Sequence, residues 1–183
     1  TRVSETEYWE HYYEDSDHHY EWNNGYLEEK GMSEKLTTES YEWFFELLRH
    51  YLRITGAGQL IALETGFRLM LPGKTTIRKP DWGVILKQNP VPWQDQHHSY
   101  PGICDLCVEA LSDSTKAEME RDTDTKFKEY ARAGVKEYYI LYAYGDPQEF
   151  YQLTAPGVYL PIPRRVRDII RSRVLPGFQF RVS

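Results

Sequence analysis

Residues 103–111 read ICDLCVEAL, an almost continuous apolar segment with the length of one strand. Strands that are buried on both faces have such runs, so we expect this segment to lie at the centre of a β-sheet. Glu109 interrupts the apolar run that extends from Leu106 to Leu111. Because burying a carboxylate costs several kcal/mol unless it is paired or bound to a metal, Glu109 requires an explanation beyond packing.

The segments around this strand predict a mixed α/β fold. Apolar residues recur at three- and four-residue spacing over residues 35–54, which is typical of a helix with one buried face. A second helix is expected to end near residues 133–134, where Gly134 is a natural C-cap. Further strands are expected at residues 59–64, 66–71, 78–86, 136–142 and 149–153, with two short ones in the tail. The order helix, strands, helix, strands indicates a central mixed sheet flanked by helices.

The N-terminal part predicts a short helix followed by a hairpin. Ser4 is a candidate N-cap for a helix over residues 4–14. Asn24-Gly25 accepts the positive φ of a tight turn, which favours a hairpin over residues 20–30. The chain has no internal repeat, low-complexity stretch or long linker, so residues 1–183 are expected to form one domain.

Composition excludes a membrane-spanning chain and indicates a cytoplasmic protein. No window approaches the ~18–20 uninterrupted apolar residues that span a bilayer. The N-terminus is acidic and has no apolar segment of the kind found in secretory signals. Cys104 and Cys107 are expected to be small buried residues in a reducing compartment.

Charge is distributed unevenly along the chain, although the net charge is −6. Residues 1–50 hold 13 acidic and 4 basic residues, whereas residues 151–183 hold 6 Arg and a single Asp. This asymmetry permits a basic face that binds nucleic acid. A solvated sheet edge explains the arginines equally well.

A second carboxylate, Asp81, follows Pro80 inside the strand expected at residues 78–86. Two carboxylates on strands of one sheet offer the hard oxygen ligands that suit Mg²⁺ or Mn²⁺. Alternatively, each carboxylate accepts hydrogen bonds from strand ends or pairs with an arginine such as Arg78. Spacing alone leaves both interpretations open.

Several motifs occur in an order that is typical of one family. They are YEWNNGYLEE (20–29), ETGFRL (64–69), RKPDW (78–82), CVEALSDST (107–115), the residues Asp122, Lys126 and Tyr130, and AGVKEYYI (133–140). Together they resemble the Uma-type restriction endonucleases, a family of the PD-(D/E)XK nuclease superfamily. The resemblance extends from about Tyr20 to Val182.

The resemblance implies a restriction-endonuclease-like core with the element order α-β-β-β-α-β. It also implies that Asp81 and Glu109 coordinate Mg²⁺ or Mn²⁺ and that a lysine completes the site. The superfamily pattern places this lysine two positions after the Glu, where this chain has Leu111. Helical geometry leaves Lys126 and Lys128 as alternatives, and the family spacing favours Lys126. The helix is then expected to begin nearer residue 121 than residue 115, so that Lys126 reaches Glu109.

Three further acids are candidates for accessory roles. Superfamily enzymes often add an acid from the first long helix, which here is Glu39, with Glu46 next. Glu64 is a candidate outer ligand, and Asp122 belongs to the family spacing. For Glu39 a solvated helix face is the alternative explanation, and for Glu64 it is a cap on the turn before Gly66.

The function implied by the resemblance is hydrolysis of DNA phosphodiester bonds by a divalent-metal-dependent endonuclease, in a homodimer. One alternative is a catalytically silent nuclease fold that binds or regulates. The acidic N-terminal third and the missing strand lysine favour this alternative, whereas buried charges oppose it. Another alternative is a structural dimerisation domain, which predicts a large exposed apolar patch.

Overall fold

The computed structural model describes residues 2–14, 17–30, 35–62, 65–111, 116–143 and 147–182. Its largest element is a six-stranded sheet with the order β10-β9-β8-β7-β6-β3. β7 and β8 are parallel, and the other neighbouring pairs are antiparallel. The strands are β3 (Gly58–Ala62), β6 (Trp82–Leu86), β7 (Leu106–Leu111), β8 (Glu137–Tyr142), β9 (Glu149–Ala155) and β10 (Val158–Pro161). The expected central mixed sheet is confirmed.

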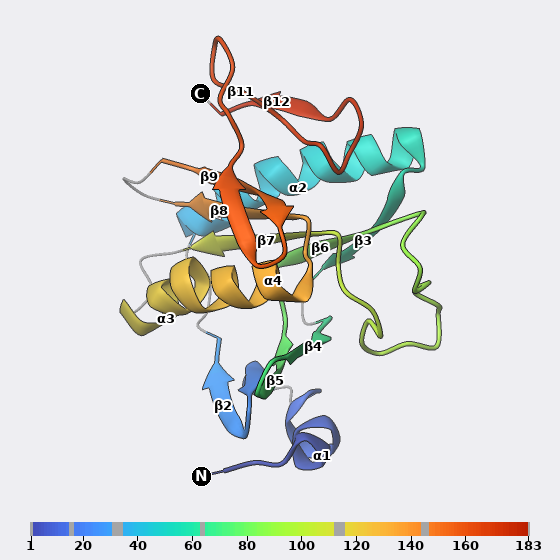
Figure 1. The fold of residues 1–183 in the computed structure, drawn as a ribbon, viewed down its shortest axis with the longest axis vertical. Helices are drawn as coiled ribbons and strands as arrows, with labels where there is room; N and C mark the ends of the chain where they lie inside the picture. Colours follow the sequence, from blue (N-terminus) through green and yellow to red (C-terminus); the bar gives the residue numbers. More distant parts are fainter. Residues whose placement is uncertain are drawn as a thin grey trace.

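Helices cover both faces of this sheet (Figure 1). α2 (Lys35–Thr55) lies on one face, and a continuous helical segment lies on the other. That segment consists of α3 (Lys116–Glu120), η2 (Arg121–Lys126) and α4 (Phe127–Ala133), and it ends at Gly134 with a φ of 93°. Because side chains alternate along a strand, Val108 packs on the α2 side and Cys107 on the α4 side.

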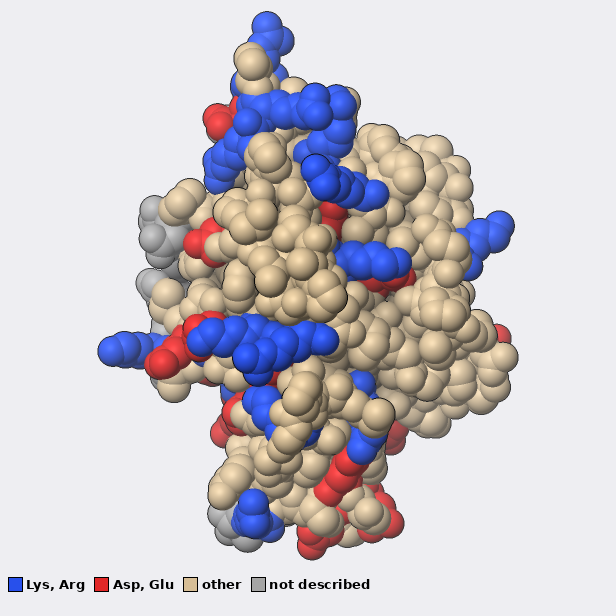
Figure 2. Space-filling model, in the orientation of Figure 1, with Lys and Arg blue, Asp and Glu red and all other residues tan. Residues whose placement is uncertain are grey.

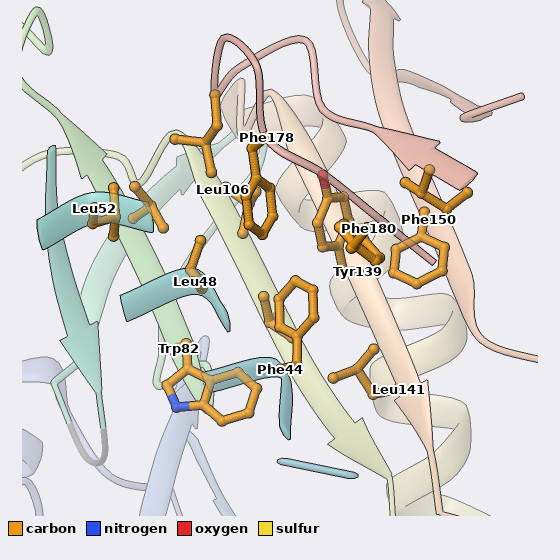
Figure 3. Packing of buried hydrophobic residues seen from close by; sticks show 14 of the residues in the cluster. Phe44, Leu48, Leu52, Trp82, Leu106, Tyr139, Leu141, Phe150, Phe178 and Phe180 are labelled. Atoms are coloured by element: carbon orange, nitrogen blue, oxygen red, sulfur yellow. The ribbon is translucent and has the colours of Figure 1, made fainter. Parts of the chain in front are cut away.

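α2 buries an apolar stripe of the predicted kind against the sheet. Phe44, Leu48 and Leu52 are four residues apart and belong to one buried cluster with Trp82 (Figure 3). Phe180 closes the cluster from the C-terminal hairpin of β11 (Ile169–Arg171) and β12 (Gln179–Arg181), with its ring centroid 5.2 Å from that of Phe44. Full burial of each such side chain stabilises the fold by about 1.5–3 kcal/mol. The two predicted tail strands are confirmed.

A smaller antiparallel sheet has the order β2-β1-β5-β4. Its strands are β1 (Tyr20–Asn23), β2 (Tyr26–Glu29), β4 (Phe67–Leu71) and β5 (Lys74–Arg78). The predicted hairpin is confirmed, with φ values of 48° at Asn24 and 101° at Gly25. The N-terminal helical segment, α1 (Glu5–Glu7) and η1 (Tyr8–Tyr12), begins with a capping box between Ser4 and Glu7, as expected.

The single strand predicted over residues 78–86 is wrong. β5 ends at Arg78 in the smaller sheet, and β6 begins at Trp82 in the central sheet. Pro80 cannot donate a ladder hydrogen bond and restricts the backbone of the residue before it, so the chain leaves one sheet and enters the other at this point. Asp81 therefore lies at the junction between the two sheets.

The two cysteines, Cys104 and Cys107, are buried and form no disulfide, as expected. Among the described residues, no helix combines the length and the apolar character that crossing a membrane requires.

Candidate active site

Asp81 and Glu109 occupy neighbouring positions at one end of the paired strands β6 and β7, where Asp81 directly precedes β6. The antiparallel register pairs Trp82 with Val108, and one step further it places Asp81 beside Glu109. The Asp81 carboxylate accepts a hydrogen bond from the Ala110 amide, at 2.7 Å from Oδ2. Glu109 is buried, while Asp81 is partly exposed. The two carboxylates singled out from the sequence thus share one site.

Lys126 contacts Glu109 from the helical segment. Its Nζ lies 3.0 Å from Glu109 Oε1 and 2.8 Å from Asp122 Oδ1. The side chain of Lys126 is 1% exposed, whereas that of Lys128 is 58% exposed and pairs with Asp124. Of the two lysines that helical geometry left open, Lys126 is therefore the one that reaches the carboxylates.

The path by which Lys126 reaches Glu109 differs from the expected one. The helix begins at Lys116, so the expectation of a start nearer Arg121 is wrong. η2 is a π-helical stretch, in which the backbone hydrogen bonds join residues five apart. Asp122 and Lys126 both lie within this stretch, and both are buried. Stretches of this kind occur frequently at functional sites.

Glu21 is a site residue that sequence reasoning missed. It lies on β1, is fully buried, and places Oε1 3.0 Å from Lys126 Nζ. The same oxygen accepts a hydrogen bond from the Lys79 amide at 2.8 Å. Its position between Tyr20 and Trp22 predicts a solvent-facing residue by strand alternation. The only sequence signal was its place in the YEWNNGYLEE motif.

Lys30 is a second missed residue, and it directly follows β2. Its Nζ donates to Asp81 Oδ1 at 3.2 Å and to the Lys79 carbonyl at 2.8 Å. The Lys30 side chain is 16% exposed. Each of the two strand carboxylates therefore has its own lysine: Asp81 has Lys30, and Glu109 has Lys126.

Arg78 does not form the pair with Asp81 or Glu109 that was one of the alternatives. Among the described residues, its fully buried guanidinium contacts Glu21 at 3.0 Å, Glu129 at 2.7 Å, and Glu28. These ion pairs join the first hairpin, β5 and α4 behind the site. Arg78 thereby fixes the position of Glu21.

Burial and charge move the pKa values of these groups in different directions. Burial raises the pKa of Glu109 to about 8; Lys126 opposes this change, and the nearby carboxylates of Asp122 and Asp81 add to it. Burial also acts to raise the pKa of Glu21, but Lys126 and Arg78 together hold it well below its usual range. Burial disfavours the Lys126 ammonium, yet Asp122, Glu109 and Glu21 raise its pKa. The lysine therefore stays charged.

The family model described as "Uma2: Putative restriction endonuclease" matches residues 5–183. The chain belongs to the Uma2 family. Among solved structures, the fold is similar to that of a "putative nuclease belonging to DUF820" from Anabaena variabilis ATCC 29413, at 10% identity and a TM-score of 0.71. That likeness covers 98% of this chain and 95% of the other, whereas comparison with curated sequences finds no match.

Leu111 occupies the position at which the resemblance led us to look for a lysine. Leu111 is buried in the apolar cluster between the sheet and α4, together with Tyr130. The Tyr130 hydroxyl donates to Glu109 Oε1 at 3.2 Å. A charged side chain at position 111 would replace an apolar contact in this cluster. Cationic groups from the helix and the hairpin reach the carboxylates instead.

The accessory candidates have different outcomes. Asp122 joins the site through Lys126. Glu39 lies in α2, but its side chain is outside the described residues, as is all of Glu64. Glu46, the second choice on that helix, is exposed.

Proposed function

We propose that this Uma2 chain is a divalent-metal-dependent endonuclease that hydrolyses phosphodiester bonds in DNA. The observation that carries the proposal is that the register of β6 and β7 brings Asp81 and Glu109 together, each with a lysine in contact with its carboxylate. Buried charges of this kind cost several kcal/mol unless they are compensated. A purely structural domain has no physical need for them.

The donor set fits Mg²⁺ or Mn²⁺. These ions bind one or two carboxylates and take their remaining ligands from water and phosphate. Asp81 and Glu109 would hold the ion, and the Lys30 ammonium at 3.2 Å from Asp81 shows that this carboxylate already binds a cation. No cluster of three or more His, Cys, Asp or Glu ligands occurs in the described part of the chain, so the phosphate and water would complete the coordination.

The chain's own residues would hold the two metal-binding carboxylates in position. When bound, the ion supplies Lewis-acid polarisation of the phosphate and a lower pKa for a bound water. The Ala110 amide and Lys30 fix the Asp81 carboxylate. Lys126 and Tyr130 both contact Glu109 Oε1 and thereby fix that carboxylate. Asp122 and Glu21 in turn fix Lys126.

A basic surface supports DNA as the partner. Figure 2 shows Lys and Arg side chains gathered at the top of the molecule, over the C-terminal segment that carries β11 and β12. The exposed arginines of that segment are Arg164, Arg165, Arg167, Arg171, Arg173 and Arg181. Phosphate contacts of this kind position a duplex without reading its sequence. We call this group the C-terminal arginines.

The structural-domain alternative predicted one large exposed apolar patch. Exposed large apolar side chains in the described residues instead come from separate elements, among them Trp43 and Ile54 on α2, Met70 on β4 and Leu160 on β10. A homodimer remains a prediction, and sedimentation equilibrium would measure it.

Cleavage of plasmid and single-stranded DNA with Mg²⁺ or Mn²⁺ tests the proposed function. We expect wild type and the exposed-loop control Asp95→Asn to cut. Asp81→Asn should reduce the rate by ~100-fold or more, because the ion supplies several kcal/mol of transition-state stabilisation. Cleavage that survives Asp81→Asn would indicate another centre. A wild-type protein that binds DNA without cutting it would favour the silent module.

A further inference from the structure

Lys30 and Lys126 differ in how far their side chains are exposed to solvent. Lys126 has three carboxylate oxygens at 2.8–3.0 Å, from Asp122, Glu109 and Glu21. One of these contacts, to Glu109 Oε1, is a hydrogen bond, and the other two are ion pairs, so three carboxylates surround this ammonium. Only 1% of the Lys126 side chain is exposed, so its ammonium is enclosed within the protein. It is therefore poorly placed to contact a substrate.

Lys30 contacts the other carboxylate, Asp81. The described residues offer its ammonium two acceptors, Asp81 Oδ1 and the Lys79 carbonyl. Its side chain and that of Asp81 are 16% and 22% exposed, so this ion pair reaches the surface of the molecule. A phosphate bound at Asp81 would therefore lie within reach of the Lys30 ammonium.

We propose that Lys30 is the catalytic lysine of this site and that Lys126 is a positioning residue. The inference rests on the proposed nuclease function and deepens it. Lys30 neutralises Asp81 before metal and substrate bind, and it then stabilises the negative charge of the scissile phosphate. The first hairpin thus supplies the cation that the superfamily pattern places where this chain has Leu111.

The reaction step explains why such a cation matters. In hydrolysis the oxygen of a water molecule bonds to phosphorus, and one ester oxygen leaves with the electron pair of the broken bond. The water proton passes to solvent and the leaving oxygen is protonated, so that one water is consumed. Negative charge grows on the phosphoryl oxygens during this step. Removing one group that stabilises such charge typically lowers kcat by about 10²–10³-fold.

The position of Lys30 on Asp81 predicts a second effect, which does not depend on activity. A divalent ion that binds Asp81 must displace the Lys30 ion pair. Lys30→Met removes this competing cation, so its affinity for Mn²⁺ should increase by about fivefold, the equivalent of one partly exposed ion pair. A lysine that only supported the fold would show the reverse, because its loss would disorder the carboxylates.

The experiment combines Mn²⁺ calorimetry with plasmid cleavage on wild type, Lys30→Met, Lys30→Gln and the exposed control Lys128→Met. The Gln variant keeps a donor for the Lys79 carbonyl and serves if Lys30→Met fails to fold. Tighter Mn²⁺ binding with about 100-fold slower cleavage supports the inference. Weaker or unchanged Mn²⁺ binding in a folded Lys30 variant overturns it.

Cleavage separates this inference from the proposed function. If wild type and the Lys30 variants cut equally fast, only the role of Lys30 is wrong. If wild type cuts none of the substrates, the proposed function fails and the catalytic role of Lys30 fails with it.

Discussion

Lys126 Nζ and Glu21 Oε1 lie 3.0 Å apart in a fully buried ion pair that joins the helical segment to the first hairpin. Removing one partner of a buried ion pair costs about 3–5 kcal/mol, and the loss of Glu21 takes one carboxylate each from Lys126 and Arg78. We therefore expect Glu21→Ala to lower the free energy of unfolding by about that amount in urea denaturation.

Asp124→Ala is the matched control for this prediction. It removes the pair with Lys128, whose partners are 53% and 58% exposed, and exposed pairs contribute at most about 1 kcal/mol. Equal losses for Glu21→Ala and Asp124→Ala would show that the buried network does not stabilise the fold.

Acid should destabilise the protein through Glu21. The folded state holds the pKa of Glu21 well below the ordinary value of 4.5, so the folded state binds fewer protons there than the unfolded state. This contribution is complete above that ordinary value and is lost as the pH falls below it. Stability measured from pH 6 down to about pH 3 should fall more steeply for wild type than for Glu21→Gln. Parallel curves would contradict the prediction.

The C-terminal arginines should dominate the electrostatic part of DNA binding. Each phosphate contact contributes about 0.9 to the slope of log K against log salt concentration. A double variant that carries Arg165→Gln and Arg173→Gln should therefore reduce this slope by about 2. The slope is measured by fluorescence anisotropy of a labelled duplex at several salt concentrations. Arg49→Gln with Arg53→Gln, which changes two exposed arginines of α2, is the control of equal charge. A larger effect from the α2 pair would place the DNA on another face.

The sequence predicted the parts of the site that conflict with their local surroundings. Glu109 was conspicuous as a charge within an apolar strand, and Asp81 followed a proline in a segment with the pattern of a strand. Their meeting follows from the register of β6 and β7, because the two strands are neighbours in one sheet. The central sheet and α2 were predicted for the opposite reason, because their apolar patterns agree with their buried faces.

Other parts depend on long-range contacts that no local pattern records. Glu21 alternates with aromatic residues like a solvent-facing residue. Arg78 from β5, Lys126 from η2 and the Lys79 amide make its buried position tolerable. Lys30 looks like an ordinary charge at the end of a hairpin until Asp81 is brought beside it. The π-helical turn was missed because an apolar period of 3.6 residues cannot reveal one widened turn.

The most direct measurement is the position of Mn²⁺ in crystals soaked with the ion and recorded for anomalous scattering. We expect one anomalous peak between the Asp81 and Glu109 carboxylates, at about 2.0–2.3 Å from an oxygen of each, and no such peak in Asp81→Asn crystals. An empty site in the wild-type crystals, or a peak elsewhere that leaves Asp81 bound to Lys30, would contradict the assignment of these two carboxylates as the metal centre.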